Sequence, residues 1–225
     1  FCQMSKRPEG CEAAVDCHVA IPTVLKVMKT HVRNKNIQNK CICFLGEVGA
    51  RYNGNSAFLD AGGIPAVLKA MIYHSSTARI QANGCRFLYS IAGWRNPSAI
   101  LDHITAVDGF RVVLNAMRRH VRNANVREEG CRALRQMIST EGRQRIAGSL
   151  IVHAGGIPVL VASMRRGATS GLHRECCCMI FDELVTHLPE CRDQIREHGG
   201  VKEIRLCSPI VQTNFDIMDG RRRIV

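Results

Sequence analysis

The fold is decided by the stretch AGGIPAVLKAM at residues 61–71. Glycine before a helix and proline in its first turn are signals that a helix begins. Val67, Leu68 and Met71 then follow at helical spacing and form an apolar stripe. The stretch therefore predicts a short amphipathic helix that starts at a double glycine.

The same helix recurs along the chain. The copies are IPTVLKVM (21–28), IPAVLKAM (64–71), FRVVLNAM (110–117) and IPVLVASM (157–164). Their final residues, Met28, Met71, Met117 and Met164, are separated by 43, 46 and 47 residues. A second apolar block follows each copy, at residues 37–45, 80–88, 126–134 and 173–181. Because two blocks keep in step over four copies, they indicate an internal repeat, and we expect the four methionines to be buried at equivalent depths.

Each repeat is expected to contain three helices. After a polar break at residues 75–77, a second helix is predicted with these side chains on one face: Ile80, Cys85, Leu88 and Ile91. A shorter apolar segment, such as residues 57–59 or 146–152, precedes each double glycine. Three helices in 43–47 residues is a period typical of all-α solenoids, in which each repeat packs against its neighbours.

The motifs of this repeat resemble those of the armadillo family. AGGIP at residues 61–65 and again at residues 154–158 resembles the opening of the armadillo repeat in β-catenin and importin-α. EGCRAL at residues 129–134 is similar to the start of the third helix of that repeat. The resemblance covers residues 21–201 and implies a right-handed α-solenoid that holds another protein in a concave groove. We therefore expect a non-enzymatic scaffold or adaptor without a cofactor.

We expect a single armadillo-repeat domain over residues 1–225, as a piece of a longer protein. Its divisions are a partial N-terminal helix (1–19), four repeats (20–60, 61–105, 106–153 and 154–198) and a partial repeat with an atypical tail (199–225). The segment 8–17 fits a first helix that runs into Ile21. It also fits the last helix of a truncated repeat, since EGCEAA at residues 9–14 is similar to EGCRAL.

Charge and cysteine content bear on the partner and the compartment. The chain has 31 Lys and Arg against 19 Asp and Glu, and a surface of this charge favours acidic partners. The 12 cysteines would suit a disulfide framework only in a short secreted chain, and the first residues lack the apolar core of a signal peptide. We expect a reduced, cytoplasmic protein, with the nucleus as the other possibility. The nearly uncharged stretch 147–164 is interrupted by Gly155, Gly156 and Pro158, so no transmembrane segment is expected.

The cysteines are interpreted as core residues with free thiols. Three of them, 176–178, are adjacent, and adjacent helical side chains point about 100° apart, so these three cannot converge on one metal ion. The repeat places Cys85, Cys131 and Cys178 at equivalent positions, where the first copy has Ile42. A position that accepts isoleucine is a core position, in which a thiol behaves as a small hydrophobic group.

Three histidines, His31, His74 and His120, are also equivalent. Each falls near the end of its helix, where imidazole can meet free carbonyl groups, and we expect this role for them rather than metal binding. No nucleophile motif, phosphate-binding loop or carboxylate pair indicates an enzyme.

The resemblance also implies which residues line the groove. Importin-α presents a Trp and, four residues on, an Asn from each third helix. The matching positions here are Cys43 and Glu47, Arg86 and Ser90, Arg132 and Gln136, and Met179 and Glu183. Since no Trp–Asn pair is present, binding of nuclear-import cargo is not expected. We expect instead an acidic protein or peptide at a groove centred on two arginines, with these partner-binding residues: Arg79, Arg86, Ser90, Arg127, Glu128, Arg132, Gln136, Met179 and Glu183.

Two alternatives stay open at this point. The face could be merely solvated, with Glu128 paired to Arg132 four residues on. Basic residues of the third repeat could instead bind nucleic acid or an anionic surface. These residues are Arg111, Arg118, Arg119, Arg122, Arg127, Arg132 and Arg135. Aromatic residues that could stack on bases are few. If the groove assignment holds, replacing Arg86 and Arg132 by Glu should abolish binding and leave the fold intact.

Overall fold

The computed structural model of the chain describes residues 17–51, 59, 61–93, 97–166 and 171–205, and these contain helices and turns but no strand. The expectation of an all-α protein is therefore confirmed for this part of the chain. The expected N-terminal helix before residue 17, residues 57–58 of the short apolar segment and the tail from residue 206 lie outside the described residues.

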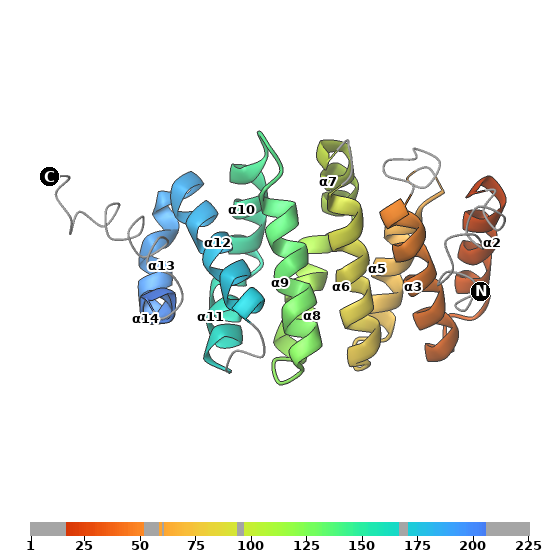
Figure 1. Cartoon of the computed structure of the whole chain (residues 1–225), viewed down its shortest axis with the longest axis horizontal. Coiled ribbons are helices and arrows are strands. Elements are labelled where there is room, and N and C mark those ends of the chain that lie inside the picture. Colours follow the sequence, from red (N-terminus) through yellow and green to blue (C-terminus); the bar gives the residue numbers. More distant parts are fainter. Residues whose placement is uncertain (1–16, 52–58, 60, 94–96, 167–170, 206–225) are drawn as a thin grey trace, which may run out of the picture.

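The helices form two rows that advance along the long axis in chain order (Figure 1). The first row packs α3 (Lys35–Arg51), α6 (Ala78–Ala92), α9 (Ala124–Ile138) and α12 (Gly171–His187) side by side. The second row contains α2 (Cys17–Thr30), α5 (Gly63–Tyr73), α8 (Gly109–Arg119), α11 (Gly156–Arg165) and α14 (Gly200–Arg205). The remaining elements, α7 (Pro97–Ala106), α10 (Gln144–His153), the 3₁₀ turn η2 (Pro189–Cys191) and α13 (Arg192–Glu197), lead back from the first row to the second.

At each turn into a second-row helix, two consecutive residues have different structural roles. The first has a left-handed backbone, with φ of 78° at Gly62, 70° at Gly155 and 75° at Gly199, which glycine adopts without a steric penalty. Asp108 occupies this place in the third repeat with φ of 59°. The second residue is glycine in all four turns, and at Gly109, Gly156 and Gly200 the preceding short helix lies too close for a side chain.

That close approach is clearest at Gly156. A Cβ there would lie 2.4 Å from Cγ2 of Ile151 and 2.7 Å from its carbonyl oxygen. Gly109 and Gly200 meet Ile104 and Ile195 in the same way. The double glycine thus sets both the direction of the chain and the spacing of consecutive helices.

Methionines fill the space between the rows. Met28, Met71, Met117 and Met164 are 4%, 0%, 1% and 1% exposed, which confirms the expected equivalent burial. A Cβ on Gly84 would lie 2.3 Å from Sδ of Met71, and one on Gly130 would lie 2.5 Å from Cγ of Met117. Glycine in the middle of α6 and α9 therefore makes room for the methionine of the same repeat.

Buried amides satisfy the ends of the second-row helices. The carbonyl groups of the last helical turn have no partner within the helix. The side-chain Nε2 of Gln81 donates to the carbonyls of Met71 at 2.9 Å and His74 at 3.1 Å, and Gln38 makes the equivalent bonds one repeat earlier. These bonds tie α3 to α2 and α6 to α5.

The aligned histidines link neighbouring repeats. Nε2 of His74 donates to the carbonyl of Val32 at 2.7 Å, and Nε2 of His120 donates to the carbonyl of Ser75 at 2.8 Å. Both rings meet carbonyl groups as expected, but these belong to the turn of the preceding repeat and not to the end of the histidine's own helix.

Within the described residues, no single helix is both long enough and apolar enough to cross a membrane. The apolar stretch 147–164 is divided between α10 and α11, whose axes are bent by 78°.

We predict that Gly156→Ala lowers the free energy of unfolding by about 2–3 kcal/mol, because the methyl group overpacks against the backbone of Ile151. Gly155→Ala is the matched control, and it should cost about 1–2 kcal/mol, chiefly for the left-handed backbone, since the nearest atom to its Cβ is the terminal Nη2 of the Arg118 side chain at 3.3 Å. Urea unfolding of both variants measures the difference. Equal losses, or a larger loss for Gly155→Ala, would show that close approach does not limit this position.

Candidate functional site

Arg86 on α6 and Arg132 on α9 meet at a carboxylate, and with it they form what we call the Arg–Glu–Arg cluster. Nε and Nη2 of Arg86 donate to Oε1 of Glu129 at 2.9 and 2.7 Å. Nη1 of Arg132 lies 3.6 Å from Oε2 of the same side chain. The cluster joins two adjacent helices of the first row and carries two positive charges against one negative charge.

The three side chains of the cluster differ in exposure. The Glu129 side chain is 6% exposed, Arg132 is 28% exposed and Arg86 is 62% exposed. A buried carboxylate needs charge and hydrogen-bond partners, so Glu129 depends on both arginines. In return it fixes the guanidinium of Arg86 at the surface.

Arg132 is held from a second side by Tyr89. Its guanidinium carbon lies 4.3 Å from the centre of the Tyr89 ring, a cation–π arrangement. Partial burial lowers the pKa of Arg132, but the hydrogen bond with Tyr89 and the charge of Glu129 outweigh this and raise it. Arg132 therefore has little freedom to move.

A shallow depression of about 260 Å³ lies beside Arg86, between α3 and α6. Glu47, Asn83 and Ser90 contribute polar groups to its wall, and Asn83 donates to the side chain of Asn39 at 2.7 Å. The exposed guanidinium of Arg86 is thus placed at the rim of a hollow that a ligand side chain could enter.

The other expected groove residues on α6 and α12 lie on the first row. Arg79 is exposed at the start of α6, and the Ser90 hydroxyl donates to the carbonyl of Arg86. Met179 is half-buried, and Glu183 pairs with His187 at 3.3 Å.

On α9, Gln136 is half-buried, and so is Glu128. Glu128 contributes to raising the pKa of Arg132, after the larger contribution of Glu129. Glu129, which was not among the expected groove residues, is therefore the carboxylate that both arginines contact.

Arg127 was wrongly assigned to the groove. It is 3% exposed, and its Nη1 donates to the carbonyl of Val121 at 2.9 Å. It occupies the repeat position of Gln38 and Gln81, whose amides bind the carbonyl groups at the preceding helix end. Arg127 has this structural role and is not accessible to a partner.

Two residues of the site were missed from the sequence, Glu129 and Tyr89. A signal for Glu129 was present, because it lies three residues before Arg132 and one repeat after Asn83, which also bonds to the preceding helix. No signal identified Tyr89, since its contact with Arg132 crosses between two helices.

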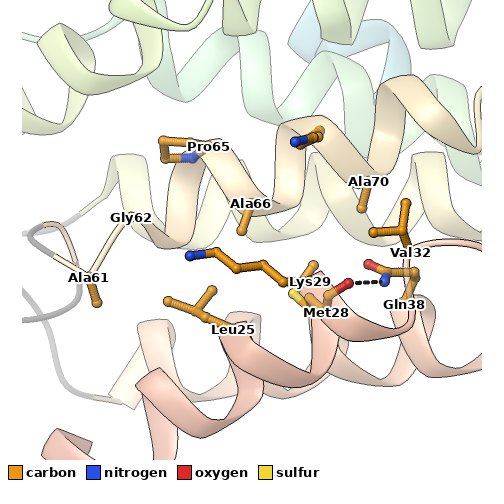
Figure 2. Close-up of a pocket in the computed structure, with 11 residues that line it drawn as sticks. Leu25, Met28, Lys29, Val32, Gln38, Ala61, Gly62, Pro65, Ala66 and Ala70 are labelled. Carbon is orange, nitrogen blue, oxygen red and sulfur yellow. Dashed lines mark hydrogen bonds between the residues drawn. The ribbon is translucent and has the colours of Figure 1, made fainter.

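A larger pocket of about 430 Å³ lies in the second row, between α2 and α5. Figure 2 shows Lys29 extended along it and Gln38 bonded to the Met28 carbonyl at its end. Leu25, Pro65 and Ala66 line it, and none of the expected partner-binding residues does.

The structure also brings together three buried groups that we call the Cys–His cluster: Cys131 on α9 with His173 and Cys177 on α12. The two sulfur atoms are 3.2 Å apart, and Sγ of Cys177 is 3.9 Å from Nε2 of His173. Neither the adjacency of residues 176–178 nor the equivalence of Cys85, Cys131 and Cys178 indicated that Cys177 meets Cys131 from the neighbouring repeat.

The pKa values of the two thiols in this cluster are shifted in opposite directions. The hydrogen bond from Cys177 lowers the pKa of Cys131 to about 6, opposed by burial and assisted by His173. The same bond, together with burial, raises the pKa of Cys177. One thiol therefore acts as the donor and the other as the acceptor.

Comparison with protein family models, with curated proteins and with solved structures finds no match for this chain.

The buried position of Glu129 corrects the expectation that Arg86→Glu with Arg132→Glu leaves the fold intact. This double variant surrounds a buried carboxylate with two more, and we predict a loss of about 3 kcal/mol or more in unfolding free energy. Adding Glu129→Gln should recover most of the lost unfolding free energy, because it removes the charge of the buried carboxylate. Urea unfolding measures both.

The matched control is Arg119→Glu with Arg122→Glu, which changes the net charge equally at two exposed positions. This control should change the free energy of unfolding by about 1 kcal/mol at most. A double variant of Arg86 and Arg132 that is as stable as this control would contradict the structural role of the cluster.

Proposed function

We propose that the chain is an armadillo-type α-solenoid that binds an acidic segment of another protein across its first row of helices. In this proposal it is a non-enzymatic scaffold or adaptor. The ligand carboxylate contacts Arg86, and the neighbouring depression receives an adjacent side chain.

Support for the armadillo-type repeat comes from features that recur with the repeat. A left-handed residue precedes α5, α8, α11 and α14, each of which begins with glycine, and the methionine of each second-row helix from α2 to α11 is buried. The first-row helices α3, α6, α9 and α12 correspond to the third helices that line the groove of armadillo proteins.

Support for an acidic ligand comes chiefly from the state of Arg86. Glu129 occupies the edge formed by Nε and Nη2, and within the described residues Nη1 has no hydrogen-bond partner. A carboxylate can bind at that free side without displacing Glu129. Because the guanidinium is already fixed, less conformational entropy is lost on binding than for a free arginine.

The alternative of nucleic-acid or anionic-surface binding is supported by Arg119 and Arg122, which are exposed at the end of α8 and in the turn after it. Other basic residues there are engaged, since Arg111 pairs with Asp108 and Arg118 donates to Asn115. Because fewer arginines remain for phosphate contacts, we favour the protein ligand.

The test is selection of binding peptides from a displayed random library, followed by affinity measurements on synthetic versions of the selected peptides. Selected peptides should be rich in Asp and Glu. Arg86→Gln should weaken peptide binding about tenfold or more, equivalent to about 1.4 kcal/mol, because the variant lacks the positively charged guanidinium group.

Arg119→Gln with Arg122→Gln serves as the charge control and should leave peptide affinity within about twofold, since rim charges mainly affect association rates. Selection of basic or apolar peptides would contradict the proposal. So would tight binding of a random single-stranded oligonucleotide that Arg119→Gln with Arg122→Gln removes and Arg86→Gln does not.

A further inference from the structure

The Cys–His cluster lies in the core, and its Cys131 is adjacent on α9 to Arg132 of the Arg–Glu–Arg cluster. Cys131, His173 and Cys177 are each 0% exposed. The ligand atoms of the three residues all lie within 4.8 Å of one another. Ser163 on α11 adds a hydroxyl 2.8 Å from Nε2 of His173.

The fourth repeat differs from its neighbours at these positions. His173 stands where Ile80 and Val126 stand in the second and third repeats. Cys177 stands where those repeats have Gly84 and Gly130. An apolar side chain and a glycine have thus both been replaced by metal-binding residue types on one face of α12.

Ser163 follows the same pattern, because it stands where the second and third repeats have Ala70 and Ala116. Core packing does not require any of these changes, since the neighbouring repeats fill the same positions with Ala, Ile or Val, and Gly. Burying an imidazole and a hydroxyl in place of apolar groups lowers stability unless they gain partners. The coincidence of all three changes around Cys131 points to a shared ligand.

The distances suit a thiophilic ion. Bonds of about 2.3 Å from zinc to sulfur and about 2.0 Å to nitrogen, at tetrahedral angles, place two sulfurs about 3.8 Å apart and a sulfur and a nitrogen about 3.6 Å apart. The observed separations are 3.2 Å for the sulfurs and 3.9 Å for Cys177 and His173. These two separations differ from the zinc geometry by about half an ångström or less. The ligand atoms of all three residues lie within 4.8 Å of one another, so side-chain rotation has to bring Cys131 and His173 to about 3.6 Å.

We propose that Cys131, His173 and Cys177 bind a Zn²⁺ ion, with the hydroxyl of Ser163 at the fourth position. The two thiols release their protons to solvent as they become thiolate ligands, and no electron transfer is required. The ion joins α9 to α12 and α11 and so locks the third repeat to the fourth. Because the site is fully buried, the ion enters while this part of the chain folds or opens.

The experiment uses the full chain, prepared metal-free with a chelator and a reductant and then titrated with Zn²⁺. One ion should bind per chain, and the melting temperature should rise. Co²⁺ in place of Zn²⁺ should give the charge-transfer absorption of thiolate ligands. The absence of both stoichiometric zinc and this absorption would overturn the proposal.

Variants that copy the neighbouring repeats keep the core packed. His173→Val and Cys177→Gly should each weaken Zn²⁺ binding at least about 100-fold, since loss of outer partners alone costs 10- to 100-fold. Ser163→Ala should weaken it less. Cys85→Ala, which removes the repeat equivalent of Cys131, should bind as the unchanged chain does.

Two outcomes would contradict the assignment even if zinc were found. Retention of wild-type affinity by His173→Val would place the ion elsewhere. Formation of a Cys131–Cys177 disulfide that persists in the presence of Zn²⁺ and reductant would mean that the sulfur pair is a covalent link instead of a metal site.

Discussion

Met71 and Met117 lie directly over the Cα atoms of Gly84 and Gly130, so the two rows of helices meet where one of them has no side chain. A larger residue would have to displace the methionine, and interiors packed at native density have no room for that. The rest of the structure depends on this contact. In the second and third repeats it holds the second-row helix against the first-row helix, while the glycine that begins the second-row helix sets the distance to the preceding short helix at Gly109 and Gly156.

The fold was predictable because its signals repeat. The spacing of the methionines, the double glycine and the apolar blocks are periodic features, and each copy confirms the others. Ile157 and Phe110 differ in shape but occupy the same buried position at a helix start, which a single copy could not have indicated. Burial of the methionines followed from that periodicity alone.

The site was only partly predictable, because its contacts cross between repeats. Arg86 and Arg132 were identified from their position on the helix, but the carboxylate between them was not. Arg127 was misassigned because an arginine on a third helix was taken as a groove residue. Its equivalence to Gln81, which bonds to the end of the preceding helix, is the feature that would have corrected this.

Charged and polar side chains that could contact a ligand occur in this chain at positions where one repeat differs from the others. Glu129 stands at the position of Asn83 and turns a neutral contact between helices into a charged one. His173 stands at the position of Ile80 and turns an apolar core position into a polar one. The periodic residues build the scaffold, and the exceptions mark the places where a ligand can be recognised.

The central claim, that a carboxylate of the partner contacts Arg86, is tested most directly by a double-mutant cycle. Arg86→Gln is combined with substitution to Gln at each acidic position of the tightest-binding selected peptide, and the four affinities give a coupling energy. We predict coupling of about 1.5 kcal/mol or more at one position, as found for close charge pairs across interfaces. Coupling within about 0.3 kcal/mol of zero at every position would contradict the account, because distant residues contribute additively.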